Sequence, residues 1–224
     1  MRVILFGATG MIGQGVLREC LLDSGVESVL SVGRSSSGQR NDKLADLVVA
    51  DVTQLPVNAP QLIGIDACFF CLGVSAVGMN EEQYSRVTYD LTIAAARTLL
   101  QLNPELAFIY VSGQGTDSTE RGRVMWARVK GRTENALLAL SRNTYMFRPG
   151  VIIPMHGIRS RTPLYNAFYA VARPLYPLLK RFVPQSVTTT ERLGRAMISA
   201  ARSRPCRRIH ETPEINALAL PVIE

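Results

Sequence analysis

The chain has no apolar run long enough to cross a bilayer as a helix. Its longest strongly apolar stretch without a charge, 67–80, has 14 residues and is interrupted by Gly73 and Gly78, whereas a spanning helix needs about 20. The first residues pass from Arg2 straight into a short apolar run and a glycine turn, without the long apolar region and cleavage site of a signal peptide. We therefore expect a cytoplasmic protein with no stable membrane insertion.

Cysteine is also scarce. Four cysteines in 224 residues are too few for a disulfide scaffold. Cys68 and Cys71 have C-x-x-C spacing, but they lie in a β-rich apolar run, where an offset of three points the two side chains to opposite faces. A redox pair is therefore not expected, and no metal site is predicted.

No internal repeat, low-complexity segment or linker divides the chain, and 47% of its residues are hydrophobic, so we expect a single domain over 1–224. Its positive charge is uneven: residues 1–120 carry about −6 and residues 121–224 about +13. A basic half attracts nucleic acid, anionic membranes or phosphate-bearing small molecules. Because the arginines are scattered among prolines without a nucleic-acid motif, a small-molecule partner is favoured over nucleic acid.

Short apolar runs alternate with longer segments of helical spacing over residues 3–149. The runs are nearly continuous in apolar residues, as expected for parallel strands covered by helices on both faces. The expected strands are Val3–Phe6, Val29–Val32, Leu47–Ala50, Ala67–Leu72, Ala107–Val111 and Tyr145–Phe147, and the expected helices are Met11–Leu22, Glu81–Leu102 and Arg123–Leu140. The order predicts an α/β fold, a doubly wound parallel sheet of the Rossmann type.

Residues 151–224 do not continue this alternation of short apolar runs and helical segments. An apolar stripe runs from Leu164 to Phe182 and is broken by Pro174 and Pro177. A second helix is expected at about Glu191–Ala201, with Thr190 as its N-cap. We predict that this region forms a small, mostly helical cap on the substrate side of the sheet.

A glycine-rich turn follows the first strand and opens the first helix. Its glycines, Gly7, Gly10 and Gly13, have G-x-x-G-x-x-G spacing, which lets the backbone approach a pyrophosphate at a helix N-terminus. The alternative is an ordinary strand-to-helix turn, but the repeated α/β pattern favours a nucleotide site. The cofactor-binding residues predicted here are Gly7, Thr9, Gly10, Met11, Ile12 and Gly13.

The end of the second strand distinguishes the two nicotinamide cofactors. An NAD site needs an acidic residue there, whereas this chain has Arg34 and Ser35, 21 and 22 positions after Gly13. A guanidinium binds a 2′-phosphate with paired charge-assisted hydrogen bonds, so NADP(H) is favoured over NAD(H), although exposed arginines are often only solvated surface. Asp51 and Val52 are placed to contact the adenine, with a turn cap as the alternative for Asp51.

Together these features resemble the short-chain dehydrogenase/reductase superfamily, specifically the small atypical members related to NAD-dependent epimerase/dehydratases and Tat-interacting-protein-like oxidoreductases. The resemblance covers about residues 1–155. The resemblance rests on the glycine turn, Asp51-Val52, Cys71-Leu72-Gly73, Val111-Ser112, Lys130 with Glu134, and Arg148-Pro149-Gly150. The resemblance implies that Ser112 lies beside the substrate carbonyl and Lys130 bonds the nicotinamide ribose. It further implies cofactor contacts from Leu72, Gly73, Pro149, Gly150 and Val151.

The chain departs from the family at the catalytic tyrosine. The family pairs Tyr with Lys at i and i+4 on one helix face, whereas Trp126 precedes Lys130 here. An indole N–H donates a hydrogen bond but does not exchange a proton as a phenol does. Tyr110, His156 and a water chain relayed by Ser112 and Lys130 are alternative proton carriers. Ser112 is otherwise a strand-terminating hydroxyl, Tyr110 a core residue and His156 a surface residue.

Two functions follow, and the sequence leaves open whether the chain turns over a substrate. The first is an NADP(H)-dependent oxidoreductase acting on a small carbonyl or alcohol, with Ser112, Lys130 and Trp126 as the catalytic residues. The second is a non-catalytic NADP(H)-sensing regulatory or binding protein, which the missing tyrosine favours. Nucleic-acid or membrane binding through the basic half is a third interpretation, and residues 123–140 are a candidate homodimer surface by the same resemblance.

Overall fold

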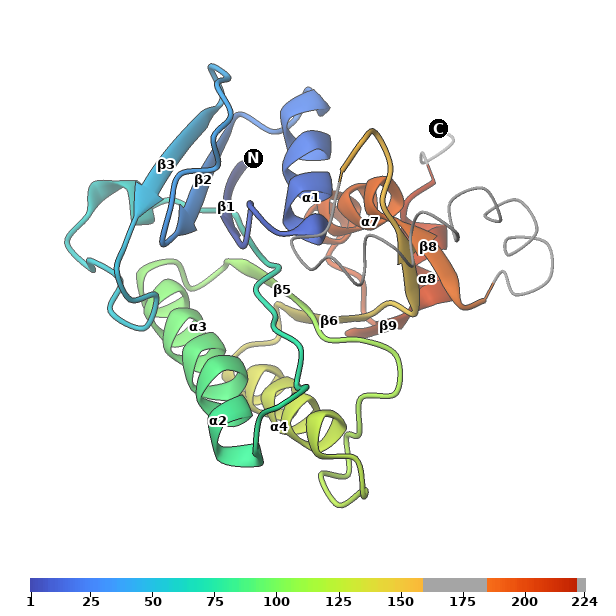
Figure 1. Cartoon of the computed structure of the whole chain (residues 1–224). Coiled ribbons are helices and arrows are strands. Elements are labelled where there is room, and N and C mark those ends of the chain that lie inside the picture. Colours follow the sequence, from blue (N-terminus) through green and yellow to red (C-terminus); the bar gives the residue numbers. More distant parts are fainter. Residues whose placement is uncertain (159–184, 221–224) are drawn as a thin grey trace.

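The protein is described by a computed structural model over residues 1–158 and 185–220. Its main sheet has seven parallel strands in the order β3-β2-β1-β4-β5-β6-β9 (Figure 1). The strands are β1 (Arg2–Phe6), β2 (Ser28–Gly33), β3 (Leu44–Val48), β4 (Ala67–Phe70), β5 (Ala107–Val111), β6 (Thr144–Arg148) and β9 (Ile209–Glu211). The predicted doubly wound sheet of the Rossmann type is confirmed.

The strand order reverses direction between β1 and β4. From this point, the chain adds β2 and β3 on one side, and β5, β6 and β9 on the other. Phe6, the last residue of β1, pairs with Val32 of β2 and Phe70 of β4, so these three strands end at the same edge. In open parallel sheets, ligands bind in the crevice beyond the carboxyl ends of the strands at such a switch point.

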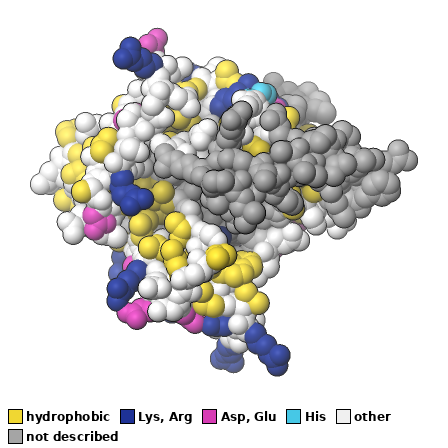
Figure 2. Space-filling model, viewed as in Figure 1, with side chains coloured by type: hydrophobic (Ala, Val, Ile, Leu, Met, Phe, Trp, Pro, Cys, Tyr) yellow, Lys and Arg dark blue, Asp and Glu magenta, His cyan; other side chains and the backbone are white. Residues whose placement is uncertain are grey.

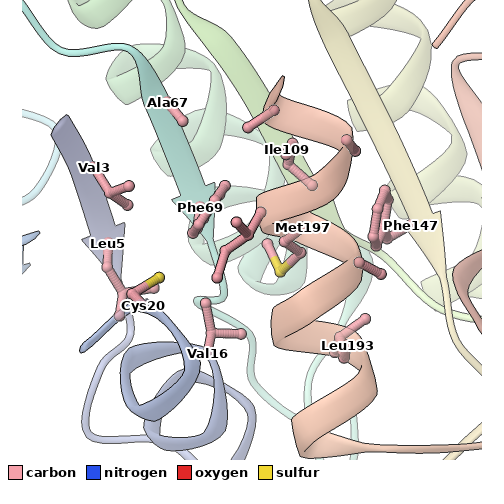
Figure 3. Close-up of a cluster of buried hydrophobic side chains, with 14 of the residues drawn as sticks. Val3, Leu5, Val16, Cys20, Ala67, Phe69, Ile109, Phe147, Leu193 and Met197 are labelled. Carbon is pink, nitrogen blue, oxygen red and sulfur yellow. The ribbon is translucent and has the colours of Figure 1, made fainter. Parts of the chain in front are cut away.

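Helices cover both faces of the sheet (Figure 1). One face carries α1 (Met11–Leu22), α7 (Thr190–Ser203) and α8 (Thr212–Leu218), and the other carries α2 (Glu81–Ser85), a π-helical turn η2 (Arg86–Asp90), α3 (Leu91–Leu102) and α4 (Met125–Leu140). Alternate residues of each strand serve opposite faces. Val3 and Leu5 pack with α1 and α7 (Figure 3), whereas Ile4 and Phe6 pack with α3.

The helices α1 and α7 approach each other closely through glycines. A Cβ on Gly15 would lie 2.5 Å from the Thr190 Cβ, and one on Gly194 would lie 2.9 Å from the Glu19 Cγ. Glu19 is buried between them, and its Oε2 forms an ion pair with Arg195 Nε at 3.0 Å. The helix α1, which follows the glycine turn, is therefore held in position by its close packing against α7.

Several predicted boundaries shift in the structure. The third strand is Leu44–Val48 rather than Leu47–Ala50, because this edge strand leaves Ala45 and Asp46 exposed and lacks a continuous apolar run. The fourth strand ends at Phe70 rather than Leu72. The predicted helix Glu81–Leu102 is present as the continuous succession of α2, η2 and α3, and a short 3₁₀ turn, η1 (Pro60–Leu62), precedes β4.

In the described part of residues 151–224, the longest elements are the helices α7 and α8, and both belong to the main layers. The helix α7 packs in the core below β5 and β6, and β9 extends the sheet beside β6. The N-cap of α7 is Thr189, whose hydroxyl accepts from the Arg192 N–H at 3.0 Å. The prediction of Thr190 as the N-cap was wrong by one residue. A separate parallel pair, β7 (Val151–Ile153) and β8 (Val187–Thr189), flanks the residues that are not described.

The predicted apolar stripe from Leu164 to Phe182 lies outside the described residues. In the described part of the chain, no helix is both long and apolar enough to span a bilayer. Cys68 packs on the α3 side of the sheet and Cys71 on the α1 side, so their side chains lie on opposite faces as predicted.

Candidate functional site

The glycine turn between β1 and α1 is tightly packed. Gly7 has a φ of +83°, and a Cβ there would lie 2.8 Å from the carbonyl oxygen of Cys71. A Cβ on Gly13 would overlap the Gly7 carbonyl and lie 2.9 Å from the Ala8 nitrogen. Both positions therefore require glycine, and the turn presses α1 against the end of β1.

The N-terminus of α1 is suited to an anion. Its N-cap, Gly10, provides no side-chain cap, and the first turn contains no acidic residue. The first N–H groups of a helix have no partner within the helix, and the helix dipole favours negative charge at this end. Thr9, Met11 and Ile12 are all partly exposed around these groups. The turn thus fits the pyrophosphate of a dinucleotide.

The loop after β4 lies directly beside this turn. The Cys71 N–H donates to the Phe6 carbonyl at 3.0 Å, which continues the pairing of β1 and β4 past their ends. Leu72 is partly buried against the core and Gly73 is exposed. Val74 and Val77 follow with 48% and 88% of their surface exposed. Figure 2 shows hydrophobic side chains gathered on this side of the molecule.

Arg34 and Ser35 follow β2 and are both exposed. Since Val32 of β2 pairs with Phe6 of β1, both residues lie at the same sheet edge as the glycine turn. Within the described ranges, the Arg34 guanidinium has no ion-pair partner. It is therefore available to an anionic ligand.

Asp51 and Val52 do not end the third strand, which stops at Val48. The Asp51 carboxylate accepts the Thr53 N–H at 2.8 Å, and this hydrogen bond lowers the pKa of Asp51. Asp51 thus caps a turn, as the alternative interpretation held, and remains exposed. Val52 is buried in the core on the α3 side, and its contact with an adenine stays a prediction.

Ser112 follows β5 and is buried in a polar network. Its hydroxyl donates to Glu134 Oε1 and also lies 3.2 Å from the Phe147 carbonyl oxygen. Glu134 is completely buried on α4, and both of its oxygens accept from Arg148 Nε, at 3.0 and 3.1 Å. The Ser112 hydroxyl is therefore engaged by Glu134 and the Phe147 carbonyl, and its implied position beside a substrate carbonyl stays a prediction.

Lys130 reaches from α4 to the end of β5. Its Nζ donates to the Ser112 carbonyl oxygen and lies 6.0 Å from the centroid of the Trp126 ring. Burial lowers the pKa of Lys130 to about 8, against the opposing influence of Glu134. Trp126 is partly exposed, and its ring would be 3.5 Å from a Cβ on Gly115. The i, i+4 spacing thus brings indole and ammonium together at the sheet edge.

The turn after β6 joins the same cluster. The Pro149 carbonyl accepts the Gln114 N–H at 2.9 Å, and the Gly150 N–H donates to Thr212 Oγ1 at 2.9 Å. A Cβ on Gly150 would lie 2.5 Å from Gln114 Oε1, so glycine lets β5 and β6 loops meet. Val151 begins β7 from this point.

Two alternative proton carriers lie elsewhere. Tyr110 is 1% exposed in the core on the α3 side, and burial raises its pKa far above the ordinary value. His156 is exposed with a φ of +54°, and its Nε2 lies 2.9 Å from Glu191 Oε2 at the start of α7. The structure therefore joins Ser112, Trp126, Lys130 and the Pro149 turn, and pairs His156 with a different helix.

The buried pair of Glu134 and Arg148 is the main element that sequence reasoning did not assign. Both residues served only as markers of the family resemblance. The signal available in the sequence was a glutamate four residues after Lys130, on the same face of the predicted helix. Its arginine partner, 14 residues away on β6, becomes apparent only when β6 is placed beside β5.

Comparison with known proteins agrees with this architecture. No protein-family model matches the chain. Protein fmp52-2, mitochondrial, of Aspergillus terreus is 24% identical over 202 residues, covering 88% of this chain and 85% of the relative. Protein FMP52-2, mitochondrial, of Scheffersomyces stipitis is 26% identical over 153 residues, 66% of this chain and 65% of the relative. Protein HTATIP2 of Rattus norvegicus is 27% identical over 154 residues, 67% and 62% respectively.

Solved structures share the fold at lower identity. The Bordetella bronchiseptica enzyme WbmF in complex with NAD⁺ has a TM-score of 0.67 at 15% identity, covering 97% of this chain and 76% of that one. UDP-glucuronic acid 4-epimerase from Bacillus cereus in complex with NAD has a TM-score of 0.66 at 13% identity, with 93% and 76% covered. The resemblance to atypical short-chain dehydrogenases/reductases is confirmed by these relatives and folds.

The comparisons correct one expectation. Five relatives, including those from Aspergillus terreus and Scheffersomyces stipitis, are named mitochondrial proteins. The prediction of a cytoplasmic protein, which depended on the lack of a long apolar run and on the character of the first residues, is therefore contradicted.

Proposed function

We propose that the chain is an NADP(H)-dependent oxidoreductase acting on a small carbonyl or alcohol. The observation that carries the proposal is that the glycine turn and the loop after β4 meet at the strand-order reversal, while Lys130 lies at the end of the neighbouring strand β5, on the same edge of the sheet. Two structural neighbours are described with NAD bound, which supports a dinucleotide ligand.

The residues divide into binding and reacting groups. The turn from Gly7 to Gly13 would hold the pyrophosphate, and Arg34 with Ser35 would hold a 2′-phosphate. Leu72, Gly73, Pro149, Gly150 and Val151 would line the cofactor, and the exposed Asp51 and the buried Val52 are the candidates near the adenine. When bound, a nicotinamide dinucleotide supplies hydride chemistry. Lys130 orients its ribose, and Trp126 covers the substrate side with an apolar ring.

A non-catalytic NADP(H)-sensing protein is the second candidate. It is favoured by Trp126 in the place of the family's tyrosine and by the engagement of the Ser112 hydroxyl with Glu134. A sensor would bind the cofactor tightly without turnover and would change its affinity for a partner on binding, as linkage requires. Equal partner affinity with and without NADPH would exclude it.

Thermal unfolding with NADPH, NADH or neither tests cofactor choice. A ligand at about 100 times its Kd adds roughly 2.7 kcal/mol of stability, and we expect the larger shift with NADPH. Arg34→Gln should remove the difference between the cofactors, whereas Arg40→Gln, an exposed arginine nearby in sequence, should preserve it. Equal shifts of the wild-type protein by both cofactors would refute the role of Arg34.

A further inference from the structure

We propose that Lys130 itself donates and accepts the substrate proton, in place of the tyrosine that the family carries at the position of Trp126. This inference depends on the proposed oxidoreductase function. It assigns to Lys130 a step beyond orientation of the cofactor ribose.

The ammonium lies beside Trp126, the position at which the family carries its tyrosine. Lys130 follows Trp126 by one helical turn, and its Nζ lies 6.0 Å from the indole centroid. The same Nζ donates to the Ser112 carbonyl oxygen, at the end of β5. A Cβ on Gly113 would lie 3.8 Å from Nζ and 4.0 Å from the Pro149 carbonyl oxygen. Glycine at 113 thus keeps side-chain atoms out of the space between the ammonium and the β6 turn.

The other candidates in the described ranges are committed elsewhere. The Ser112 hydroxyl donates to Glu134, whose two carboxyl oxygens also accept from Arg148 Nε and Nη2. Tyr110 is enclosed in the core and His156 is paired with Glu191. Trp126 has no exchangeable acid of useful strength.

The surroundings of Lys130 suit proton exchange near neutral pH. Glu134, on its own helix, is the carboxylate that faces it, and the charge of Glu134 is shared with Arg148 from β6. Burial outweighs that attraction and lowers the pKa of Lys130 to about 8. A general acid acts best when its pKa is near the working pH.

The proposed step reduces a carbonyl to an alcohol. The substrate carbonyl carbon accepts a hydride, with its two electrons, from a reduced nicotinamide dinucleotide. The carbonyl oxygen takes a proton from Lys130 Nζ and becomes a hydroxyl. The neutral amine then recovers a proton from water, and alcohol oxidation follows the reverse course.

Nuclear magnetic resonance of the intact chain labelled with ¹³C-lysine tests the titration without a substrate. The chain has three lysines, Lys43, Lys130 and Lys180, so three side-chain signals are expected. The signal that disappears in Lys130→Arg is assigned to Lys130 and should titrate with a midpoint near pH 8. A midpoint above pH 10 would overturn the proposal whether or not a cofactor binds.

Kinetics with NADPH and a panel of aldehydes, ketones and quinones tests the step. Lys130→Arg keeps the charge and the hydrogen-bond donor but has no dissociable proton, so kcat should fall at least about 100-fold while NADPH affinity changes less than threefold. Small primary amines should restore part of kcat to Lys130→Ala. Lys43→Arg, whose lysine binds the Asp23 carbonyl, is the matched control.

The outcomes separate this inference from the proposed function. Absence of NADPH binding by the wild-type protein would refute both. Binding without turnover of any carbonyl would refute the oxidoreductase proposal together with the proton step and would favour the sensor. A kcat for Lys130→Arg within threefold of wild type would refute only the role of Lys130 as the proton donor.

Discussion

Replacement of Glu134 by glutamine should lower the free energy of unfolding by about 3 kcal/mol. Removal of one partner from a buried ion pair costs about 3–5 kcal/mol, because it leaves an uncompensated charge in the interior. Glu134 is completely buried, while the Arg148 side chain retains 12% exposure. Arg148 also keeps hydrogen bonds to Ser118 Oγ at 2.6 Å and Glu211 Oε1 at 3.4 Å, which favours the lower end of that range.

Glutamine removes the negative charge of Glu134 but keeps nearly the same side-chain shape, so the effect of the charge is measured alone. Its amide oxygen still accepts the Ser112 proton, so the loss falls on the pairing with Arg148. Urea unfolding at pH 7 measures the effect, and the slope should be unchanged because the surface exposed on unfolding is the same. A chain of this length should lose about 6–12 °C in Tm for such a change.

A matched surface pair provides the control. Arg86 and Glu82 form an i, i+4 ion pair whose side chains are 69% and 73% exposed, so Glu82→Gln should cost less than about 0.5 kcal/mol. Combining Glu134→Gln with Arg148→Met should recover part of the stability, because the stranded cation is removed. If Glu134→Gln costs no more than Glu82→Gln, the reasoning about this buried network is wrong.

Three further predictions concern other parts of the site. Gly13→Ala should abolish stabilisation by NADPH, because its Cβ would overlap the Gly7 carbonyl; thermal shifts measure this, and an undiminished shift would contradict it. Trp126→Tyr should raise NADPH-dependent carbonyl reduction by less than about tenfold over Trp126→Phe, because Lys130 already supplies the proton; a gain of about 100-fold with Tyr alone would show that the wild-type protein lacks an acid. Hydrogen bonds from Thr119 and Gly122 lower the pKa of Asp117, so its contribution to stability is present above about pH 4 and lost as the pH falls. Asp117→Asn should flatten that acid limb in urea unfolding from pH 3 to 7, and an unchanged limb would argue against the loop hydrogen bonds.

Central elements of the fold were predictable from local pattern. The inner strands are buried on both faces and read as continuous apolar runs, and α1 occupies the predicted residues, Met11–Leu22. The edge strand β3 was misplaced by three residues at its start, because an exposed edge tolerates Ala45 and Asp46. The one-residue error at the N-cap of α7 arose because Thr189 and Thr190 are adjacent and only their backbone conformations distinguish them.

The placement of Ser112 and Lys130 at one edge of the sheet was predictable, but the direction of their hydrogen bonds was not. Motif positions identified Ser112 and Lys130, since the ends of parallel strands meet at one edge. The donation from Ser112 to Glu134 joins residues 22 apart in the chain, and it depends on how deeply α4 packs beside β5 and β6. Asp51 illustrates the same limit: its turn-capping role follows from where β3 ends, which composition alone did not fix.

The parallel pair β7 and β8 has a consequence for protein engineering. Val151 pairs with Val187 and Ile153 with Thr189, and the Met155 N–H donates to Thr190 Oγ1 at 3.1 Å. The two points where the chain leaves and rejoins the described body are therefore fastened side by side by main-chain bonds. Because these two points are held together by the strand pair, a change in the length of the chain between them should add little loop-closure cost.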